Sequence, residues 1–375
     1  MNQKLARAAR ELDYATPCLL IDVDRVEANF QALRAAMPDT AIYYAMKANP
    51  APEIMERVAS LGSSFDCASV PEIEMALATG IDASRISFGN TIKKERDIAQ
   101  AFRLGVPLFA FDSLSELEKI ARAAPGAKVF CRILTDGAGA EWPLSRKFGC
   151  VPSMAVDLLR KAVALGVVPW GVSFHVGSQQ KNVEAWDGAI AEAAAIFTTL
   201  EADGIRLGLV NMGGGFPTAY LEDVPAAEAY GQAIHASLIR HFGNRLPQTI
   251  IEPGRGLVGD CGLLVSEVVL VAEKGDADGR PWVFLDVGKF GGLAETMDEA
   301  IRYRITTDRQ GPERRVVIAG PTCDSADVLY EKSDYRLPSD LTAGDRVQIH
   351  GTGAYTTTYA SVAFNGFAPL ACRCV

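Results

Sequence analysis

Features that mark several other classes of protein are absent from this 375-residue chain. No segment reaches the ~18 to 20 apolar residues of a membrane-spanning helix, and residues 1–17 lack the apolar core of a secretion signal. The eight cysteines form no Cys-x-x-Cys pair, and the four histidines lack the spacing of zinc ligands. We therefore expect a reduced, cytoplasmic protein without a structural metal ion or a membrane partner.

An excess of positive charge is absent as well. The chain has 37 lysines and arginines against 46 aspartates and glutamates, so its formal net charge is −9 at pH 7. Nucleic acids and anionic membranes need a basic face on a protein partner, and the charge therefore argues against both. Hydrophobic residues make up 49% of the chain, which is typical of a globular protein with a large core.

Between about residues 40 and 255, short apolar segments alternate with longer amphipathic ones. The short segments, rich in β-branched and aromatic residues, are 41–46, 64–69, 86–90, 107–112, 128–134, 169–177, 207–214 and 249–254. Helical patterns follow them, and this alternation indicates a parallel sheet covered by helices. Eight such units in about 215 residues favour an α/β fold of the (β/α)8 TIM-like barrel type.

After residue 262 the pattern changes to strand-like segments separated by Gly, Asp and Pro turns, without long helices between them. This pattern predicts a second, mostly antiparallel β domain, of the sandwich or barrel-like kind. The strand in PCLLIDVDRVEANF, residues 17–30, is assigned to the same domain. The predicted domains are thus a barrel of residues 31–261 and a β domain of residues 1–30 and 262–375.

Polar residues or glycines end nearly every predicted barrel strand. They are Lys47, Asp66, Asn90, Asp112, Arg132, His175, Gly213 to Gly215 and Glu252. In a (β/α)8 barrel the carboxyl ends of the strands form one rim, where active sites lie. The convergence of these residues predicts an active site at that rim rather than a series of separate buried polar groups.

The loops after the last two predicted strands, NMGGGFP (211–217) and EPGRG (252–256), have the composition of an anion site. Three adjacent glycines let backbone N–H groups approach an anion, and Arg255 adds a guanidinium suited to phosphate oxygens. Phosphate commonly binds at this position of a barrel. We therefore expect a ligand that carries a phosphate group.

Lys47 faces this anion site across the predicted rim, which suggests a Schiff base with a phosphorylated aldehyde. Keeping a free lysine neutral at pH 7 costs about 4–5 kcal/mol, and imine formation removes that cost. Glu252 below a pyridine ring would keep the ring nitrogen protonated, as pyridoxal phosphate chemistry requires. Taken singly, a solvated Lys47 and a structural His175 are the alternatives.

A set of motifs in the chain resembles the fold-type III pyridoxal phosphate decarboxylases. The motifs are YYAMKANP, FDCAS, SRKFG, GVSFHVGSQ, GGGFP, EPGR, GPTCDSAD, GAYT and FNGF, in the order found in that family. The resemblance runs from about Tyr14 to Phe367, and within the family it is closest to ornithine decarboxylases, especially the bacterial ornithine/lysine branch. It implies an alanine racemase-like fold, pyridoxal 5′-phosphate as cofactor, and decarboxylation of L-ornithine to putrescine or of L-lysine to cadaverine.

The resemblance also implies a role for each matching residue. Lys47 forms the Schiff base, His175 stacks on the ring, Glu252 pairs with the ring nitrogen, and Asp66 and Arg132 line the cofactor cleft. The residues implied at the phosphate are Ser178, Gly213, Gly214, Gly215, Arg255 and Tyr355, and Gly254 is implied as a further cofactor-binding residue. Cys323 is similar to the cysteine that reprotonates Cα, and Asp324 to the carboxylate that meets the distal ammonium of the substrate. Tyr355 and Phe364 are expected to line the substrate pocket.

In this family Cys323, Asp324 and Tyr355 reach the site across a subunit interface, which implies a head-to-tail homodimer with two shared sites. Residues 291–303, GGLAETMDEAIRY, depart from the eukaryotic pattern, where an aromatic–Asp pair meets the distal amine. An alignment with one gap matches Asp298 to the aspartate of that pair, and Glu295 and Glu299 are the alternatives. A solvated acidic turn is a further alternative, and the choice between ornithine and lysine stays open.

Other functions also stay open. Diaminopimelate decarboxylase shares the fold, although its usual Cys-Glu-Ser-Gly-Asp signature contrasts with the Cys-Asp-Ser-Ala-Asp of residues 323–327. A non-catalytic carrier of pyridoxal phosphate, or a Schiff-base aldolase acting on sugar phosphates, would account for the barrel. The strand-rich second domain, with its cysteine–aspartate pair, argues against the carrier, and the aldolase predicts a purified protein without a bound chromophore.

Overall fold

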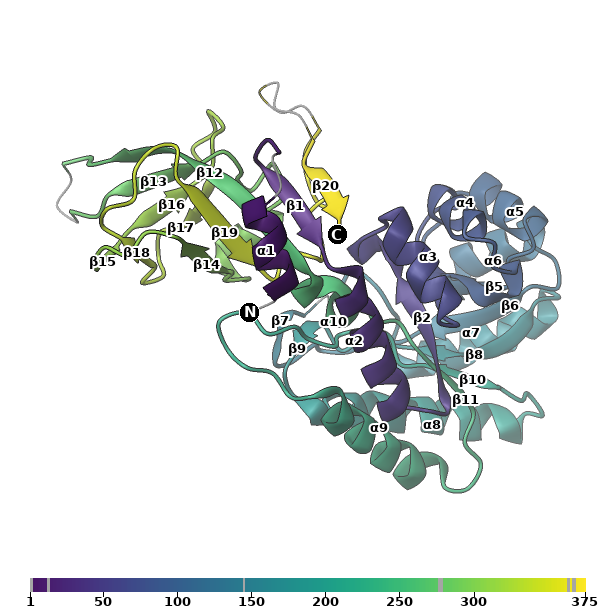
Figure 1. Ribbon diagram of the computed structural model, residues 1–375. Helices are drawn as coiled ribbons and strands as arrows, with labels where there is room; N and C mark the ends of the chain where they lie inside the picture. The colour runs from purple at the N-terminus through teal and green to yellow at the C-terminus, as the bar shows by residue number, and fades with distance from the viewer. Residues whose placement is uncertain (1–2, 12–13, 144–145, 276–278, 363–364, 366–368) are drawn as a thin grey trace. The chain divides into compact units, whose positions relative to one another are not determined.

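The computed structural model describes residues 3–11, 14–143, 146–275, 279–362, 365 and 369–375 (Figure 1). The chain forms two compact units. The β unit comprises Met1–Val26, Thr218–Asp223 and Leu257–Val375, and the barrel unit comprises Glu27–Pro217 and Val224–Gly256. The predicted domains, 31–261 and 1–30 with 262–375, differ from these units by a few residues at each boundary and by the segment 218–223.

The barrel unit contains a closed sheet of parallel strands in the order β10-β11-β2-β3-β4-β5-β6-β8, which confirms the predicted (β/α)8 barrel. Each predicted segment overlaps one strand: β2 (Thr40–Ala45), β3 (Ser64–Cys67), β4 (Ile86–Phe88), β5 (Leu108–Phe111), β6 (Lys128–Arg132), β8 (Val168–Ser173), β10 (Leu209–Asn211) and β11 (Gln248–Ile251). Leu108, Ala110, Phe130, Leu209 and Ile250 form one apolar cluster of this barrel. Because the strands run parallel, all their carboxyl ends lie at one end of the barrel.

Helices cover the outside of the barrel (Figure 1). They are α2 (Val23–Ala36), α3 (Pro52–Ser60), α4 (Val70–Ala78), α5 (Glu95–Arg103), α6 (Leu114–Ala123), α7 (Pro152–Ala164), α8 (Asp187–Ala202) and α9 (Ala227–Phe242). Proline in the first turn of α3, α4 and α7 favours helix initiation, and Ser69 caps α4 by accepting a hydrogen bond from the N–H of Glu72. Short elements complete the unit: η1 (Met46–Ala48), η2 (Ala83–Arg85), η3 (Val183–Trp186) and the antiparallel pair β7 (Ala140–Trp142) and β9 (Ser178–Gln180).

The β unit is built on a sheet in the order β14-β19-β12-β13-β16-β17, with β1 pairing with β12 and β20. The strands are β1 (Cys18–Ile21), β12 (Gly262–Ala272), β13 (Trp282–Leu285), β14 (Arg304–Thr307), β16 (Val317–Ala319), β17 (Val328–Tyr330), β19 (Arg346–His350) and β20 (Ala371–Cys374). Of these pairings, β13–β16 and β1–β20 are parallel and the others are antiparallel, so the mostly antiparallel character is confirmed.

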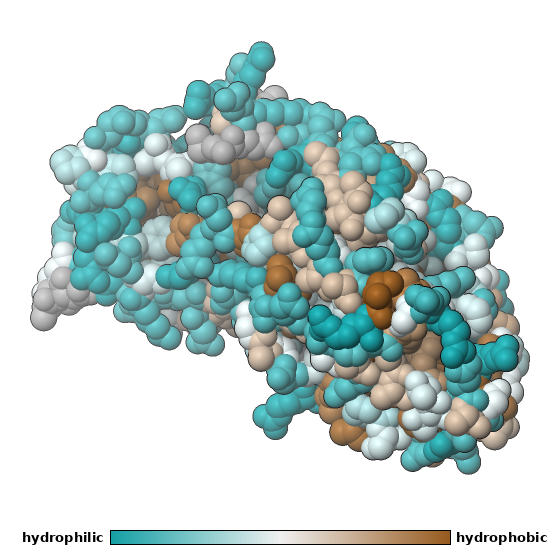
Figure 2. All heavy atoms as spheres, turned by 90° about the horizontal axis from the view of Figure 1, so that it is seen from below, coloured by the Kyte–Doolittle hydropathy of each residue, from teal (hydrophilic) through white to brown (hydrophobic). Residues whose placement is uncertain are grey.

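Smaller elements complete the β unit: α1 (Gln3–Glu11), α10 (Arg255–Val258) at its border, η4 (Gly259–Cys261), η5 (Ala294–Glu299) and the pair β15 (Glu313–Arg315) with β18 (Arg336–Pro338). Helix α1 packs Leu5 and Ala9 against β1 and β12. Hydrophilic residues cover much of the face in Figure 2, with groups of hydrophobic ones between them. In the described part of the chain no helix has the length and apolar character needed to span a bilayer.

Candidate active site

Lys47 and Asp66 meet at the carboxyl ends of neighbouring strands. Lys47 lies in η1, directly after β2, and Ala45 of β2 is in register with Asp66 of β3. The Nζ of Lys47 is 3.1 Å from Oδ2 of Asp66, whose residue is 4% exposed. Among the described residues the other carboxylate oxygen, Oδ1, has no hydrogen-bond partner, and a Cβ on Gly89 would collide with it. A buried acceptor without a partner is costly in a folded protein and indicates a place prepared for a polar ligand atom.

Glu252 follows β11 and is held by Asn211 at the end of β10. The Asn211 Nδ2 donates to Oε1 of Glu252 at 2.5 Å, and Asn211 Oδ1 accepts from the N–H of Gly213 at 2.9 Å. Burial raises the pKa of Glu252 to about 7, with Asp66 adding to the effect, while Lys47 acts in the opposite direction. A carboxyl group with this pKa exchanges its proton readily at neutral pH, and a cation beside it would favour its charged form.

His175 follows β8 and carries a neutral ring. Burial lowers the pKa of His175 well below 6.5, and Arg132 and Lys47 lower it further. Its Nδ1 accepts a hydrogen bond from the N–H of Gly177 at 3.0 Å, which places the ring proton on Nε2. A Cβ on Gly214 would lie 3.1 Å from that Nε2, so this glycine lets the backbone approach the imidazole.

The glycine segment after β10 forms a narrow backbone cradle. Gly213 and Gly215 have φ values of +64° and +108°, which favour glycine, and a Cβ on Gly215 would lie 2.7 Å from the carbonyl oxygen of Gly177. Close by, Nε and a terminal nitrogen of Arg255 donate to Oγ of Ser178, both at 3.3 Å. Arg255 is 3% exposed and follows the buried Gly254. A buried guanidinium, a hydroxyl group and open backbone are the groups that bind a phosphate.

The structure therefore brings the barrel residues of the predicted site to one end of the barrel, and these are Lys47, Asp66, Arg132, His175, Ser178, Gly213 to Gly215, Glu252, Gly254 and Arg255. The other predicted residues belong to the β unit. Cys323 and Asp324 are exposed, Tyr355 is partly buried with a φ of +58°, and Asp298 is exposed with a φ of +52°. Phe364 lies outside the described residues.

Sequence reasoning missed the residues that hold these side chains in place. Asn211 is fully buried and joins Glu252 to the glycine segment. Asp327, 2% exposed, accepts from the hydroxyl group of Thr322 at 2.7 Å and from the N–H of Lys289 at 2.8 Å. It thereby anchors the loop that carries Cys323. Both residues stand inside motifs visible in the sequence, but no spacing marks them as anchors.

Comparison with known proteins identifies the family. The model of the pyridoxal-dependent decarboxylases, for their pyridoxal-binding domain, matches residues 23–259 of the chain. The chain belongs to this family. The enzyme is accordingly a decarboxylase that depends on pyridoxal phosphate.

Individual relatives cover almost the whole enzyme. A lysine/ornithine decarboxylase of Selenomonas ruminantium is 36% identical over 354 residues, 94% of this chain and 88% of its own length. The crystal structure of a lysine decarboxylase from the same organism is 34% identical, with a TM-score of 0.89, covering 100% of this chain and 96% of that one. A lysine/ornithine decarboxylase of Vibrio vulnificus complexed with cadaverine is 31% identical, with a TM-score of 0.88, covering 100% of this chain and 98% of that one.

The residues at the barrel end fit pyridoxal phosphate. The cradle of Gly213 to Gly215 has no room for side chains, the Oδ1 of Asp66 has no partner within the described part of the chain, and burial raises the pKa of Glu252 to about 7. A phosphorylated, cationic heteroaromatic aldehyde would use all three features, with Lys47 as the amine.

Proposed function

We propose that this enzyme decarboxylates L-ornithine to putrescine and also accepts L-lysine, giving cadaverine. The observation that carries the proposal is the grouping of Lys47, Asp66 and Glu252 at the ends of neighbouring strands, next to the strand that ends in the glycine cradle, in a chain 36% identical to a lysine/ornithine decarboxylase. Diaminopimelate decarboxylase is the alternative within the same fold, and activity on diaminopimelate in place of both diamino acids would replace the proposal.

The barrel residues would hold the cofactor. We assign Lys47 to its aldehyde, Glu252 to its ring nitrogen, His175 to its ring face, and Asp66 and Arg132 to the walls of its cleft. Ser178, Gly213 to Gly215, Gly254 and Arg255, with Tyr355 from the β unit, would hold its phosphate. When bound, pyridoxal phosphate withdraws electrons from the substrate's Cα, so that the bond from Cα to the carboxylate can break.

Glu252 and His175 differ in charge: Glu252 is assigned as a carboxylate, and His175 as a neutral ring. The N–H of Asn211 stabilises the carboxylate form of Glu252, and a carboxylate at this place keeps a proton on a neighbouring ring nitrogen. His175 remains neutral because burial, together with Arg132 and Lys47, lowers its pKa. It would therefore lie against the ring of a bound cofactor without adding a positive charge to that face.

The β unit would supply the groups that recognise the rest of the substrate. A buried ammonium group without an anionic partner is strongly unfavourable, so a carboxylate must meet the distal amine. We assign this role to Asp324 and Asp298, and we assign the return of a proton to Cα to Cys323. Tyr355 and Phe364 would line the same pocket.

We further propose a head-to-tail homodimer located in the cytoplasm, with Cys323, Asp324 and Tyr355 serving the partner's barrel. Mixing the inactive variants Lys47→Ala and Cys323→Ala should restore about a quarter of the activity, because random exchange leaves one intact site in half of the dimers. Mixed variants that form heterodimers and stay inactive would contradict shared sites.

The substrate assignment is tested by kcat/KM on L-ornithine, L-lysine and diaminopimelate. Asp324→Ala should lower kcat/KM on the preferred diamino acid about 10²-fold or more, since the distal ammonium loses its partner, while cofactor absorbance stays unchanged. Asp334→Ala is a matched control, because Asp334 is an exposed carboxylate of the β unit paired with Arg315 at 2.7 Å. An Asp324→Ala enzyme with wild-type kcat/KM would refute the assignment.

A further inference from the structure

The end of η5 has an unusual backbone. Asp298 and Glu299, two adjacent residues, have φ values of +52° and +58°, in the left-handed region. Such a conformation costs about 1–2 kcal/mol for each residue that is not glycine. Two consecutive residues remain in it only where surrounding contacts hold them.

The contacts that hold this turn come from the Glu299 carboxylate. Oε1 accepts the N–H groups of Glu331 and Lys332 at 2.8 and 2.6 Å, and Oε2 accepts the N–H of Ser333 at 2.8 Å and its hydroxyl group. Burial opposes the charge of Glu299, but the bonds from Ser333 and the backbone prevail and lower its pKa. We call this arrangement the Glu299 clamp. It fastens the end of η5 to the turn that follows β17.

A second attachment lies a few residues further along. The hydroxyl group of Tyr330, the last residue of β17, donates to the carbonyl of Ile301 at 2.9 Å and accepts the N–H of Tyr303 at 2.8 Å. Both attachments follow Asp298 in the chain, so they fix the backbone at Asp298 without using its carboxylate. In the described part of the chain that carboxylate has no partner, and Asp298 is exposed.

The clamp also distinguishes among Glu295, Asp298 and Glu299, the three acids that are candidates for binding the distal amine. Glu299 is engaged by the turn at 331–333, and Glu295 is only 5% exposed. Asp298 is the acid of this segment that is left to meet a cationic ligand. The distance between the Asp298 carboxylate and the Cα of the substrate must be closely fixed. Ornithine and lysine differ by only one methylene, a difference worth about 1–3 kcal/mol in a fitted site.

We infer that Glu299 is a positioning residue that holds Asp298 in the left-handed conformation and thereby sets the preference between ornithine and lysine. The inference rests on the proposed function, in which Asp298 meets the distal ammonium of the substrate. Glu299 itself touches no substrate. Its loss lets the turn relax to ordinary helical or extended backbone, and the Asp298 carboxylate then moves relative to the distal amine.

A double-mutant cycle tests this inference. kcat/KM is measured on L-ornithine and L-lysine for the wild type, Glu299→Ala, Asp298→Ala and the double variant, with cofactor absorbance and Tm beside it. Glu299→Ala should shift the ornithine-to-lysine ratio at least about threefold when Asp298 is present, and less than about twofold when it is absent. Glu299→Gln should act in the same direction, because its amide N–H groups face backbone donors.

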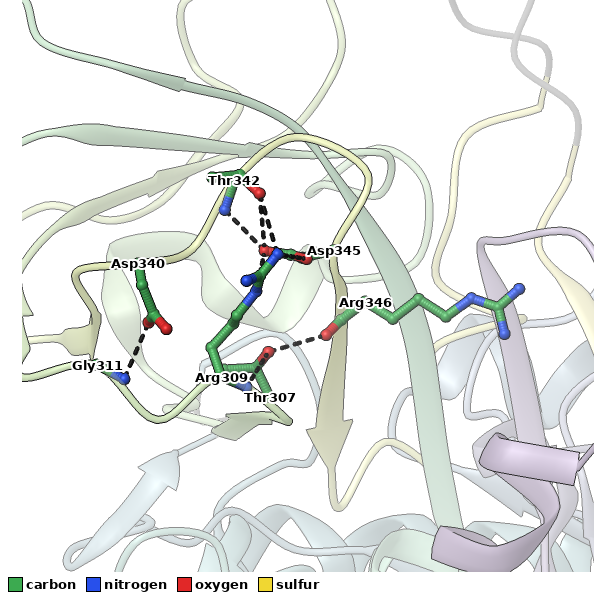
Figure 3. Close-up of polar contacts among 7 residues, drawn as sticks. All are labelled: Thr307, Arg309, Gly311, Asp340, Thr342, Asp345 and Arg346. Carbon is green, nitrogen blue, oxygen red and sulfur yellow. Dashed lines mark hydrogen bonds and ion pairs between the residues drawn. The ribbon is translucent and has the colours of Figure 1, made fainter.

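Asp345 offers a matched control for a carboxylate that only anchors a loop (Figure 3). It accepts from Nε and a terminal nitrogen of Arg309 at 2.8 and 2.7 Å and from the N–H of Thr342 at 2.7 Å, just before β19. Asp345→Asn should lower Tm and leave the substrate ratio unchanged. If the ratio moves as much in Asp345→Asn as in Glu299→Ala, the effect is general destabilisation and the inference is wrong.

The remaining outcomes are equally decisive. An unchanged ratio in Glu299→Ala, or an equal shift in the Asp298→Ala background, overturns the inference and leaves the proposed function standing. A wild-type enzyme that decarboxylates neither diamino acid overturns the proposed function instead. If Glu299→Ala does not fold, Ser333→Ala removes a single donor from the clamp, and the same comparison of ratios is made with it.

Discussion

Replacing Glu116 by glutamine perturbs a buried ion pair of the barrel unit. Glu116 of α6 is 3% exposed, and its Oε1 lies 3.1 Å from Nζ of Lys93, whose side chain is 0% exposed. The same Nζ donates to the carbonyl oxygens of Asn90 and Ala110, at the ends of β4 and β5, at 2.7 and 2.6 Å. Lys93 therefore ties two strand ends together, and Glu116 supplies its neutralising charge.

The magnitude follows from the protonation of Lys93. Burial lowers the pKa of Lys93 from 10.5 to about 8, and the charge of Glu116 opposes this effect. At about 1.4 kcal/mol per pH unit, keeping the ammonium charged at pH 7 already costs about 3 kcal/mol. Glutamine removes the opposing charge, so the pKa of Lys93 falls further. At pH 7, one pH unit below the wild-type pKa, deprotonation of Lys93 limits the electrostatic loss to about 1.4 kcal/mol, so we expect Glu116→Gln to lower the free energy of unfolding by about 1–2 kcal/mol.

The stability difference between wild type and Glu116→Gln should also depend on pH. Because the pKa of Lys93 is lower in the folded than in the unfolded chain, stability rises with pH, in the wild type between about 8 and 10.5. In Glu116→Gln this rise begins at a lower pH. The difference in stability between wild type and variant should therefore be larger at about pH 6 than at about pH 9.

Urea unfolding at several pH values, followed by tryptophan fluorescence, measures this difference. Trp142, Trp170 and Trp186 lie in the barrel unit and report its unfolding. Glu95→Gln is the matched control, since Glu95 pairs with Arg122 at 2.9 Å on the exposed surface between α5 and α6 and should leave stability unchanged. A difference for Glu116→Gln that is small, or equal at all pH values, would refute the reasoning.

Three further predictions concern the active site. Borohydride treatment followed by peptide mapping should mark Lys47, and Lys47→Ala should be colourless as purified; a mark on another lysine would contradict its assignment. Glu252→Gln should lower kcat about 10²- to 10³-fold with cofactor absorbance retained, because a neutral amide does not hold the ring proton, and wild-type kcat would count against this role. Asp327→Asn should lower the free energy of unfolding by about 1–3 kcal/mol and kcat at least tenfold, since an amide cannot accept all the donors of Thr322 and Lys289. The enzyme should still bind its cofactor, and unchanged kcat would show that the Cys323 loop needs no such anchor.

The barrel was predictable because its signals are local. Each parallel strand is a short apolar run, each is followed by an amphipathic helix, and the polar residue that ends a strand is next to it in the chain. Lys47, Asp66 and Glu252 could therefore be placed at one rim from the order of the segments, and the observed strand registers bring Asp66 beside Ala45. The resemblance to a family then supplied expected roles that spacing alone does not give.

The anchoring contacts were not predictable from the sequence. They are hydrogen bonds between residues far apart in the chain, and such bonds leave no repeating pattern in the sequence. Asn211 reaches Glu252 across 41 positions, and Glu299 reaches Ser333 across 34. Residues 218–223 belong to the β unit although they directly follow a barrel strand and its glycine segment. Nothing in the local composition of these residues indicates such partners.

The sequence by itself determined the barrel, the cofactor family and the amine, acid and glycine segment at its rim, since these depend on residue type and short-range order. Only the tertiary structure decided that Glu252 titrates near neutral pH and that Glu299, not Asp298, is engaged by the backbone. The physical reason is that desolvation and hydrogen-bond geometry depend on which distant groups surround a side chain, and those neighbours exist only once the chain has folded.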